Sequence, residues 1–155
     1  MTELSYPATG EAVMNDLASL LELYRRLHPM DPIIEIDDSI RKQWKSMLDT
    51  PMLRQIVARD GERVVSACTL VIVPNLTRGA RPYGLIENVV TDPNWRRRGI
   101  GTAVLRYALN VAWTERCYKV MLMTGSNREE TLRFYEKAGF VRGEKTGFIA
   151  KPPIV

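Results

Sequence analysis

Hydrophobic residues in the first third of the chain recur at helical spacing. From Glu11 to Leu27, apolar side chains return every three or four positions, which predicts a helix with one buried face. Pro29 lies just beyond this stretch, and the residue before a proline avoids the helical conformation. The same spacing over Ser39–Leu48 predicts a shorter helix, with Asp38 or Ser39 as its N-terminal cap.

The remainder of the chain alternates between strand-like and helix-like patterns. Leu53–Arg59 and Glu62–Val73 are rich in β-branched residues, and Asp60-Gly61 between them favours a tight hairpin turn. Gly139 is expected to end the last helix in the left-handed conformation. The further predicted strands are Gly84–Thr91, Lys119–Thr124, Phe140–Arg142 and Phe148–Ala150, and the further predicted helices are about Gly99–Glu115 and Arg128–Ala138.

This order of elements predicts an α+β fold, and we expect a single domain over residues 1–155. A chain of 155 residues, with 45% hydrophobic and 26% charged residues, has the balance of a soluble globular domain that needs no disulfide or metal. Cys68 and Cys117 lack metal-ligand spacing and are expected to be reduced thiols. No signal-peptide pattern is present, and the apolar stretches are too short to cross a bilayer. We therefore expect a cytoplasmic protein without a membrane partner.

A short segment after the strand Gly84–Thr91 has the composition of a phosphate-binding loop. Arg96–Gly101 contains three arginines followed by Gly-Ile-Gly, and it leads directly into a predicted helix. Glycines let the backbone approach a ligand closely, and the N–H groups at a helix start are unpaired and carry partial positive charge. Together with the arginines, these groups favour an anion site suited to a pyrophosphate.

Two well-known phosphate loops do not match this segment. A Rossmann fingerprint requires a third glycine three residues after Gly101, where Val104 stands, and a Walker A loop requires Gly-Lys followed by Ser or Thr. The net charge of +4 is modest, and its densest cationic run lies at this one loop. That distribution favours an anionic ligand over a nucleic acid, which would need basic and aromatic residues along a groove.

What remains is an arginine followed by two spaced glycines after a strand, and this segment resembles the GNAT (GCN5-related) N-acetyltransferase superfamily. Arg96–Gly101 is similar to the family's pyrophosphate motif, Phe134–Phe140 to its second signature, and Val89–Thr91 to the strand that pairs with the pantetheine arm. The resemblance covers about Gly84–Phe140 well and the N-terminal third only in the order of elements. It implies a mixed, mostly antiparallel sheet that is flanked by helices and splayed where the pantetheine arm enters.

The resemblance also implies acetyl-CoA as the acyl donor, with no metal. Asn127 stands close to the place of the family's asparagine before the last helix, although it is one residue too far from Tyr135. The residues expected to contact acetyl-CoA are Val89, Val90, Thr91, Arg96, Arg97, Arg98, Gly99, Ile100, Gly101, Thr102 and Asn127.

Two residues are candidates for the chemistry. The resemblance places Tyr135 where the family has its general acid, and a phenol could protonate the departing thiolate. The alternative is a core aromatic residue on an amphipathic helix. Glu87 stands in an otherwise apolar strand, where partial burial would raise its pKa and let it act as a base toward an amine. Alternatively it faces outward, and a period of two puts it on one face with Val89 and Thr91.

The predicted function is transfer of an acetyl group to the primary amine of a small molecule by direct attack in a ternary complex. No cysteine lies in a recognisable nucleophile motif. A sugar, an amino acid, a polyamine, an antibiotic and a protein N-terminus all stay open as acceptors, and so does a homodimer. Arg78 and Arg81 could hold an acidic substrate or lie in a solvated loop. Two other classes also stay open: a small basic nucleic-acid-binding protein, and a GNAT-fold sensor that binds acyl-CoA without turnover.

Overall fold

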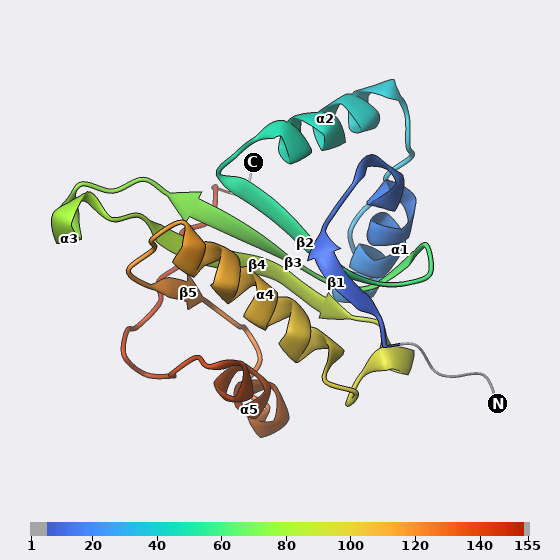
Figure 1. Ribbon diagram of the computed structural model, residues 1–155. Coiled ribbons are helices and arrows are strands. Elements are labelled where there is room, and N and C mark those ends of the chain that lie inside the picture. Colours follow the sequence, from blue (N-terminus) through green and yellow to red (C-terminus); the bar gives the residue numbers. More distant parts are fainter. Residues whose placement is uncertain (1–5, 154–155) are drawn as a thin grey trace.

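A computed structural model describes residues 6–153 of the chain. Its centre is a sheet with the strand order β1-β2-β3-β4-β5, in which the first four strands are antiparallel and β5 runs parallel to β4 (Figure 1). This mixed, mostly antiparallel sheet confirms the predicted α+β class. The strands are β1 Ala8–Glu11, β2 Leu53–Asp60, β3 Arg63–Val73, β4 Tyr83–Thr91 and β5 Val120–Leu122.

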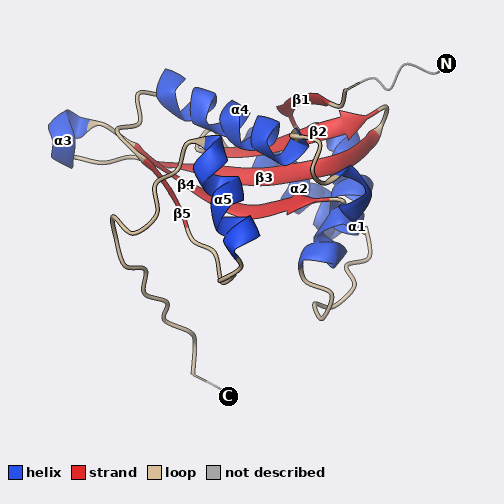
Figure 2. Ribbon diagram, turned by 90° about the horizontal axis from the view of Figure 1, so that it is seen from below, coloured by secondary structure: helices blue, strands red, loops and turns tan. Residues whose placement is uncertain are grey.

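Helices cover both faces of the sheet (Figure 2). One face carries α1 and α2, whose Leu20, Leu23 and Trp44 are buried against it. The other face carries α4, with Val104 and Leu105 fully buried, and α5 packs beside α4. The helices are α1 Leu17–Leu27, α2 Asp38–Asp49, α3 Thr77–Ala80, α4 Ile100–Thr114 and α5 Glu129–Ala138, with short 3-10 turns at Met14–Asp16 and Pro93–Trp95.

The N-terminal prediction was wrong at its beginning. Residues from Ala8 to Glu11 form the edge strand β1, paired with β2, and the α-helix begins only at Leu17. The carboxylate of Asp16 accepts a hydrogen bond from the backbone N–H of Val13 (2.7 Å) and an ion pair from Arg59 of β2, which fixes the turn between strand and helix. The structure of these residues is therefore determined by pairing with β2 and not by the helical spacing of their own sequence. In α2 the cap is Asp37, which accepts from the Ile40 N–H (2.9 Å), and not Asp38 or Ser39.

The two predicted C-terminal strands, Phe140–Arg142 and Phe148–Ala150, are also wrong. Residues 140–153 follow an irregular path away from the sheet beside β5 (Figure 2). A β-rich segment becomes a strand only when a neighbouring strand accepts its hydrogen bonds. In the described part of the chain, the one backbone hydrogen bond that these residues make runs from the Phe140 N–H to the Tyr135 carbonyl (3.1 Å) and belongs to the end of α5. The hairpin of β2 and β3 and the helices α4 and α5 are confirmed, and Gly139 ends α5 with φ 111°.

Candidate functional site

A β-bulge in β4 controls which side chains face which layer. Asn88 has φ 53°, and the pairing of β4 with β3 skips one residue between Ala67 and Thr69. One extra residue in β4 reverses the alternation beyond it. Glu87 therefore lies opposite Thr69 on the α1–α2 face, whereas Val89 packs against the α4 face. The prediction of one shared face for Glu87, Val89 and Thr91 was wrong for this reason.

The sheet opens immediately before the bulge. β5 pairs with β4 only over Gly84–Ile86, so from Glu87 to Thr91 that edge of β4 has no partner strand within residues 6–153. This confirms the predicted splayed sheet. An open strand edge can accept an extended ligand through main-chain hydrogen bonds. Part of that capacity is already used, because the carbonyl of Thr91 accepts from the Nε of Arg96 (3.2 Å).

The start of α4 lies directly after this open edge. Ala103 is the first residue of α4 whose N–H donates to a backbone carbonyl, that of Gly99 (2.9 Å). Gly99 itself has the left-handed conformation, with φ 77°. The N–H groups from Arg97 to Thr102 have no acceptor among the described residues. Such a helix start can bind an anion without any side-chain contribution. The structure therefore brings the predicted pyrophosphate loop next to the predicted pantetheine strand.

Gly101 is required here by close packing. A Cβ built at this position would lie 2.9 Å from the Oγ1 of Thr91 and 3.1 Å from the ring of Phe134. The absent side chain lets α4 approach both β4 and α5. Ile100 is buried, as is Val90 on the opposite face of β4, so these two residues could reach a ligand only through their backbone. Thr102 is also mostly buried, but it lines a pocket along the outer side of α4.

The three arginines of the loop differ in their surroundings. Arg97 is highly exposed and makes an ion pair with Glu130 (3.3 Å). Arg98 lies over the ring of Trp95, with 5.0 Å from its guanidinium carbon to the ring centroid. Arg97 also has φ 60°, an unusual value for a residue with a side chain. The loop therefore presents a positive surface beside the free N–H groups.

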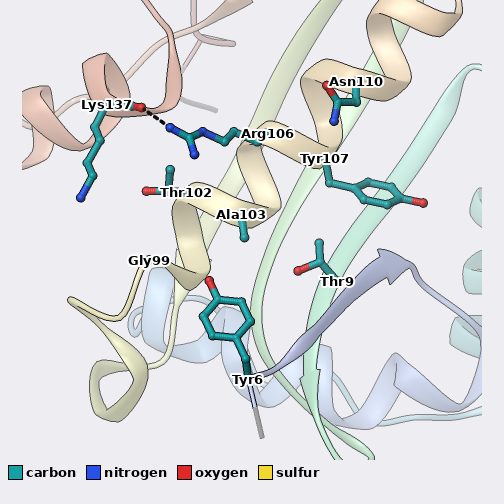
Figure 3. Close-up of a pocket in the computed structure, with 9 residues that line it drawn as sticks. All are labelled: Tyr6, Thr9, Gly99, Thr102, Ala103, Arg106, Tyr107, Asn110 and Lys137. Carbon is teal, nitrogen blue, oxygen red and sulfur yellow. Dashed lines mark hydrogen bonds between the residues drawn. The ribbon is translucent and has the colours of Figure 1, made fainter.

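A pocket of about 470 Å³ continues from this loop along the outer side of α4 (Figure 3). Its wall includes Gly99 and Thr102 of the loop and two cations that were not predicted, Arg106 and Lys137. Arg106 donates to the backbone carbonyl of Lys137 (3.3 Å), which joins α4 to α5. These cations could hold further negative charge of a nucleotide bound at the helix start. The other lining residues are Tyr6, Thr9, Ala103, Tyr107 and Asn110.

The two predicted catalytic residues lie on opposite faces of the sheet. Tyr135 on α5 packs against the core on the α4 side, between Phe134 and Phe140 at ring distances of 5.0 and 6.4 Å. Burial raises the pKa of Tyr135, nearby Cys68 and the charge of Glu87 raise it further, and a hydrogen bond with Thr124 acts in the opposite direction. Glu87 is exposed, so its predicted partial burial was wrong.

Some polar residues were missed, and others are not brought to the site. Thr69 is buried in the sheet beside Glu87, and Gln55 is buried on the other side of Thr69. The only sequence signal was a polar residue inside an apolar strand. Asn127 is exposed between β5 and α5, and its role stays a prediction. Arg81 donates to the carbonyls of Arg116 and Cys117 (both 3.3 Å), which gives it a structural role.

Comparison with known proteins agrees with this geometry. Residues 17–140 match the acetyltransferase (GNAT) family. The chain belongs to this family. A glucosamine 6-phosphate N-acetyltransferase from Trypanosoma brucei brucei is 33% identical over 133 residues, which cover 84% of this chain and 86% of that protein. Human N-alpha-acetyltransferase 30 is 34% identical over 91 residues, 57% of this chain and 24% of that protein.

The GNAT fold is also found among solved structures. A protein of Agrobacterium tumefaciens str. C58 superposes with a TM-score of 0.88 at 44% identity, covering 94% of this chain and 99% of that one. The chain with residues 17–140 in this family is thus a GNAT acyltransferase. Members of this family take the acetyl group from acetyl-CoA. No helix within residues 6–153 is both long and apolar enough to cross a membrane.

Arg97→Glu should weaken CoA binding by roughly ten-fold, because it places a negative charge beside the helix start without entering the core. Gly101→Asp is less suitable, since any side chain there collides with Thr91 and Phe134. Isothermal calorimetry with CoA measures the effect. Lys42→Glu, an equal change of charge on exposed α2, should leave the dissociation constant unchanged. Equal affinities for the two variants would contradict a pyrophosphate site at this loop.

Proposed function

We propose that the protein is an N-acetyltransferase that moves an acetyl group from acetyl-CoA to the primary amine of a small molecule, by direct attack in a ternary complex. The observation that carries this proposal is the position of Glu87 and Tyr135. They approach the opening between β4 and β5 from opposite faces of the sheet, and the charge of Glu87 contributes to the raised pKa of Tyr135. A thioester in the opening would meet an amine on one side and an acid on the other.

The residues present fit the proposed acyl donor. The unpaired N–H groups of Arg97–Thr102 would hold its pyrophosphate, and the open edge of β4 at Val89 and Thr91 would take hydrogen bonds from the pantetheine amides. The donor supplies an activated acyl group, so the protein has only to bind, orient and transfer protons. Held in this way, the thioester would reach the last paired residue of β4, Ile86, next to Glu87.

Tyr135 is suited to protonate the departing sulfur. Burial raises the pKa of Tyr135 above its ordinary value, so the phenol stays protonated at neutral pH. The two cysteine thiols, in contrast, are poor nucleophiles. Burial raises the pKa of Cys68 to about 12 and also raises that of Cys117, so neither forms much thiolate at neutral pH. This supports direct transfer over an acyl-cysteine intermediate.

Glu87 is suited to the amine side. Primary amines are mostly protonated at neutral pH and attack a carbonyl only after losing a proton. Glu87 is solvent-exposed at the opening and lies on the face that α1 covers. It could accept that proton directly or through a water. A protein that only senses acyl-CoA would need neither group, so retention of both residues favours turnover.

Glucosamine 6-phosphate is a second candidate for the acceptor. The relative from Trypanosoma brucei brucei is named for glucosamine 6-phosphate, and it matches most of both chains. Ile86–Val90 and Cys117–Val120 also resemble that kind of enzyme. Asn88 stands where we expect aspartate in it, and Asn88 is the residue of the bulge that borders the opening. Because discrimination that rests on polar contacts is steep, this one difference leaves another hydroxylated or basic amine as our preference.

Tyr135→Phe should lower kcat by roughly 10²–10⁴-fold, because it removes a positioned acid and keeps the ring that packs between Phe134 and Phe140. Wild-type activity should also fall above about pH 10, where the phenol with its raised pKa begins to ionise, and the variant should lack this fall. Release of free thiol across pH measures both. Tyr83→Phe at the start of β4 is the control. A wild-type kcat in Tyr135→Phe would make Tyr135 a packing residue only.

Glu87→Gln should be most defective at low pH, where the acceptor is an ammonium ion that needs a base. The defect in kcat/KM should shrink as the pH approaches the pKa of the amine, about 10 for an alkylamine. Glu62→Gln, in the exposed turn after β2, is the matched control. If the defect of Glu87→Gln is the same at every pH, Glu87 positions the acceptor and does not remove its proton.

Steady-state kinetics with glucosamine 6-phosphate decide the acceptor question. Our preference for another amine predicts a kcat/KM well below ~10⁴ M⁻¹s⁻¹, the lower end for an enzyme with its own substrate. A value at or above this level would make glucosamine 6-phosphate the acceptor. If our preference for another amine is right, a panel of amino sugars, polyamines and amino acids, measured in parallel by thiol release, should contain a better substrate than glucosamine 6-phosphate.

A further inference from the structure

Four basic residues gather at the end of β4 that lies opposite the start of α4. Arg78 lies in α3, the short turn that projects from the molecule between β3 and β4 (Figure 1). Arg81 follows α3, and Arg116 and Lys119 come from the segment between α4 and β5. The two segments are joined, because the Nε of Arg81 donates to the backbone carbonyl of Arg116 (3.3 Å). These four residues form the cationic patch.

Two tyrosine rings hold charged groups of the cationic patch in place. Tyr83 and Tyr118 meet edge to face, with 6.3 Å between their ring centroids. The Nζ of Lys119 lies 5.5 Å from the ring centroid of Tyr83 and 5.3 Å from that of Tyr118. The guanidinium carbon of Arg78 also lies over the Tyr118 ring, at 6.0 Å. A ring face attracts a cation, so these side chains lose part of their freedom before any ligand binds.

No acidic side chain neutralises the cationic patch. Within residues 6–153, none of its four residues makes an ion pair with a carboxylate. Residues 74–82 and 116–122 contain no aspartate or glutamate. Glu115 stands directly before Arg116, but its carboxylate pairs with Arg54 (3.1 Å). Like charges that are held close together repel one another, so an anionic partner would stabilise this arrangement.

The cationic patch is too far from the acetyl-CoA loop to serve the anionic groups of the cofactor. β4 begins at Tyr83 beside the patch and ends at Thr91 before the loop. The eight residue steps between them span about 27 Å of strand. Charges on a protein surface are screened over about 8 Å at physiological ionic strength. A ligand of the cationic patch would therefore be distinct from acetyl-CoA.

The backbone that carries Arg78 is held in an unusual conformation. Arg78, Gly79 and Ala80 are all left-handed, with φ values of 56°, 70° and 57°. Residues with a Cβ adopt this conformation at a cost, and such residues are concentrated at ligand-binding segments. The amide of Asn75 closes the turn by donating to the backbone carbonyl of Arg81 (3.2 Å). The turn therefore presents the Arg78 side chain from a fixed backbone.

The exposed groups beside the cationic patch indicate the kind of partner. Leu76, directly before α3, is 92% exposed, so positive charge is combined with an apolar side chain. Single-stranded nucleic acids stack their bases on open ring faces, but Arg78 and Lys119 already lie over the ring of Tyr118. A small anion would make only ion pairs between exposed groups, which are individually weak. An acidic protein segment with an apolar residue would make several such pairs and also cover Leu76.

We infer that the cationic patch and Leu76 form a docking surface for an acidic segment of a partner protein, in which carboxylates flank an apolar residue. The carboxylates pair with Arg78 and Lys119, and the apolar residue packs on Leu76. The surface lies at the end of β4 where the pairing with β5 begins, so the docked segment leaves the acetyl-CoA loop free.

Fluorescence anisotropy measures this docking with a labelled peptide of glutamates that contains two leucines. Excess CoA is added to the full chain, so that the positive loop before α4 is occupied. The peptide should bind the wild type, and more weakly as salt rises, because salt screens exposed charges. Arg78→Glu with Lys119→Glu should weaken this binding by roughly ten-fold or more. Arg41→Glu with Lys42→Glu, an equal change of charge on exposed α2, is the matched control and should bind like the wild type.

Leu76→Ser tests the apolar contact separately. Because Leu76 is almost fully exposed, this variant keeps the fold. It should weaken binding of the peptide with leucines by roughly three-fold and leave binding of a peptide of glutamates alone unchanged. The variant keeps the inference testable if charge reversal at Lys119 disturbs the start of β5. Thiol release with a small amine should match the wild type in all these variants, since none of the changed residues lies at the opening or the acetyl-CoA loop.

The outcomes distinguish this inference from the proposed function. No binding by the wild type, equal affinities of the Arg78 and Lys119 double variant and its control, or equal binding of a peptide with lysines in place of glutamates overturns the inference. Tighter binding of a single-stranded oligothymidylate, lost in the same double variant, also overturns it and assigns the surface to nucleic acid. Docking is measured without turnover, so absence of acetyl transfer to every amine would overturn the proposed function alone.

Discussion

The separation of β4 from β5 after Ile86 is the constraint on which the rest of the site depends. Had the parallel pairing continued, the backbone edge of β4 would be used by β5 and no extended ligand could reach it. The bulge at Asn88 follows directly, where an extra residue disrupts the ladder with β3 and increases the local twist. Because of this bulge, Glu87 and Val89 lie on opposite faces of the sheet at the position where β4 is separated from β5.

The helical layers on the two sides of this opening have different roles. On the α4 side, Gly101 lets the helix start approach Thr91 at the end of β4, and the N–H groups of that start have no acceptor among the described residues. Tyr135 comes from α5 on the same side and stays protonated because burial raises its pKa. Its apolar surroundings keep Tyr135 neutral, and the helix start offers the N–H groups that an anion would need.

The α1 side is different because polar groups are built into its core. Asp16 is buried but is paired with Arg59 and with the N–H of Val13, so it stabilises the junction between β1 and α1. The amide nitrogen of Gln55 has no such partner among residues 6–153. The α1 side therefore contains one buried polar side chain that is paired and one whose donor is left without an acceptor.

The sequence by itself determined the elements whose signal is local. The helix α4, the β2–β3 hairpin and the left-handed Gly139 each depend on residues close in the chain, and all three were predicted. The turn of the hairpin is Gly61-Glu62 and not Asp60-Gly61, because Asp60 still pairs with Arg63. The glycines beside the arginines also predicted an anion site, because a helix start exposes its N–H groups whatever the rest of the fold does. The family resemblance of Arg96–Gly101 and Phe134–Phe140 added the splayed sheet and the candidate acid.

Only the tertiary structure decided features that depend on a distant partner. Strand β1 exists because β2 pairs with it, and the expected C-terminal strands do not form because no strand within residues 6–153 pairs with them. The face of Glu87 was predicted wrongly, since a bulge changes the alternation and leaves no pattern in the apolar residues. Gln55, Thr69 and Glu87 come together only because three strands pair in register, and register is set by packing and turn geometry across the whole sheet rather than by any one strand.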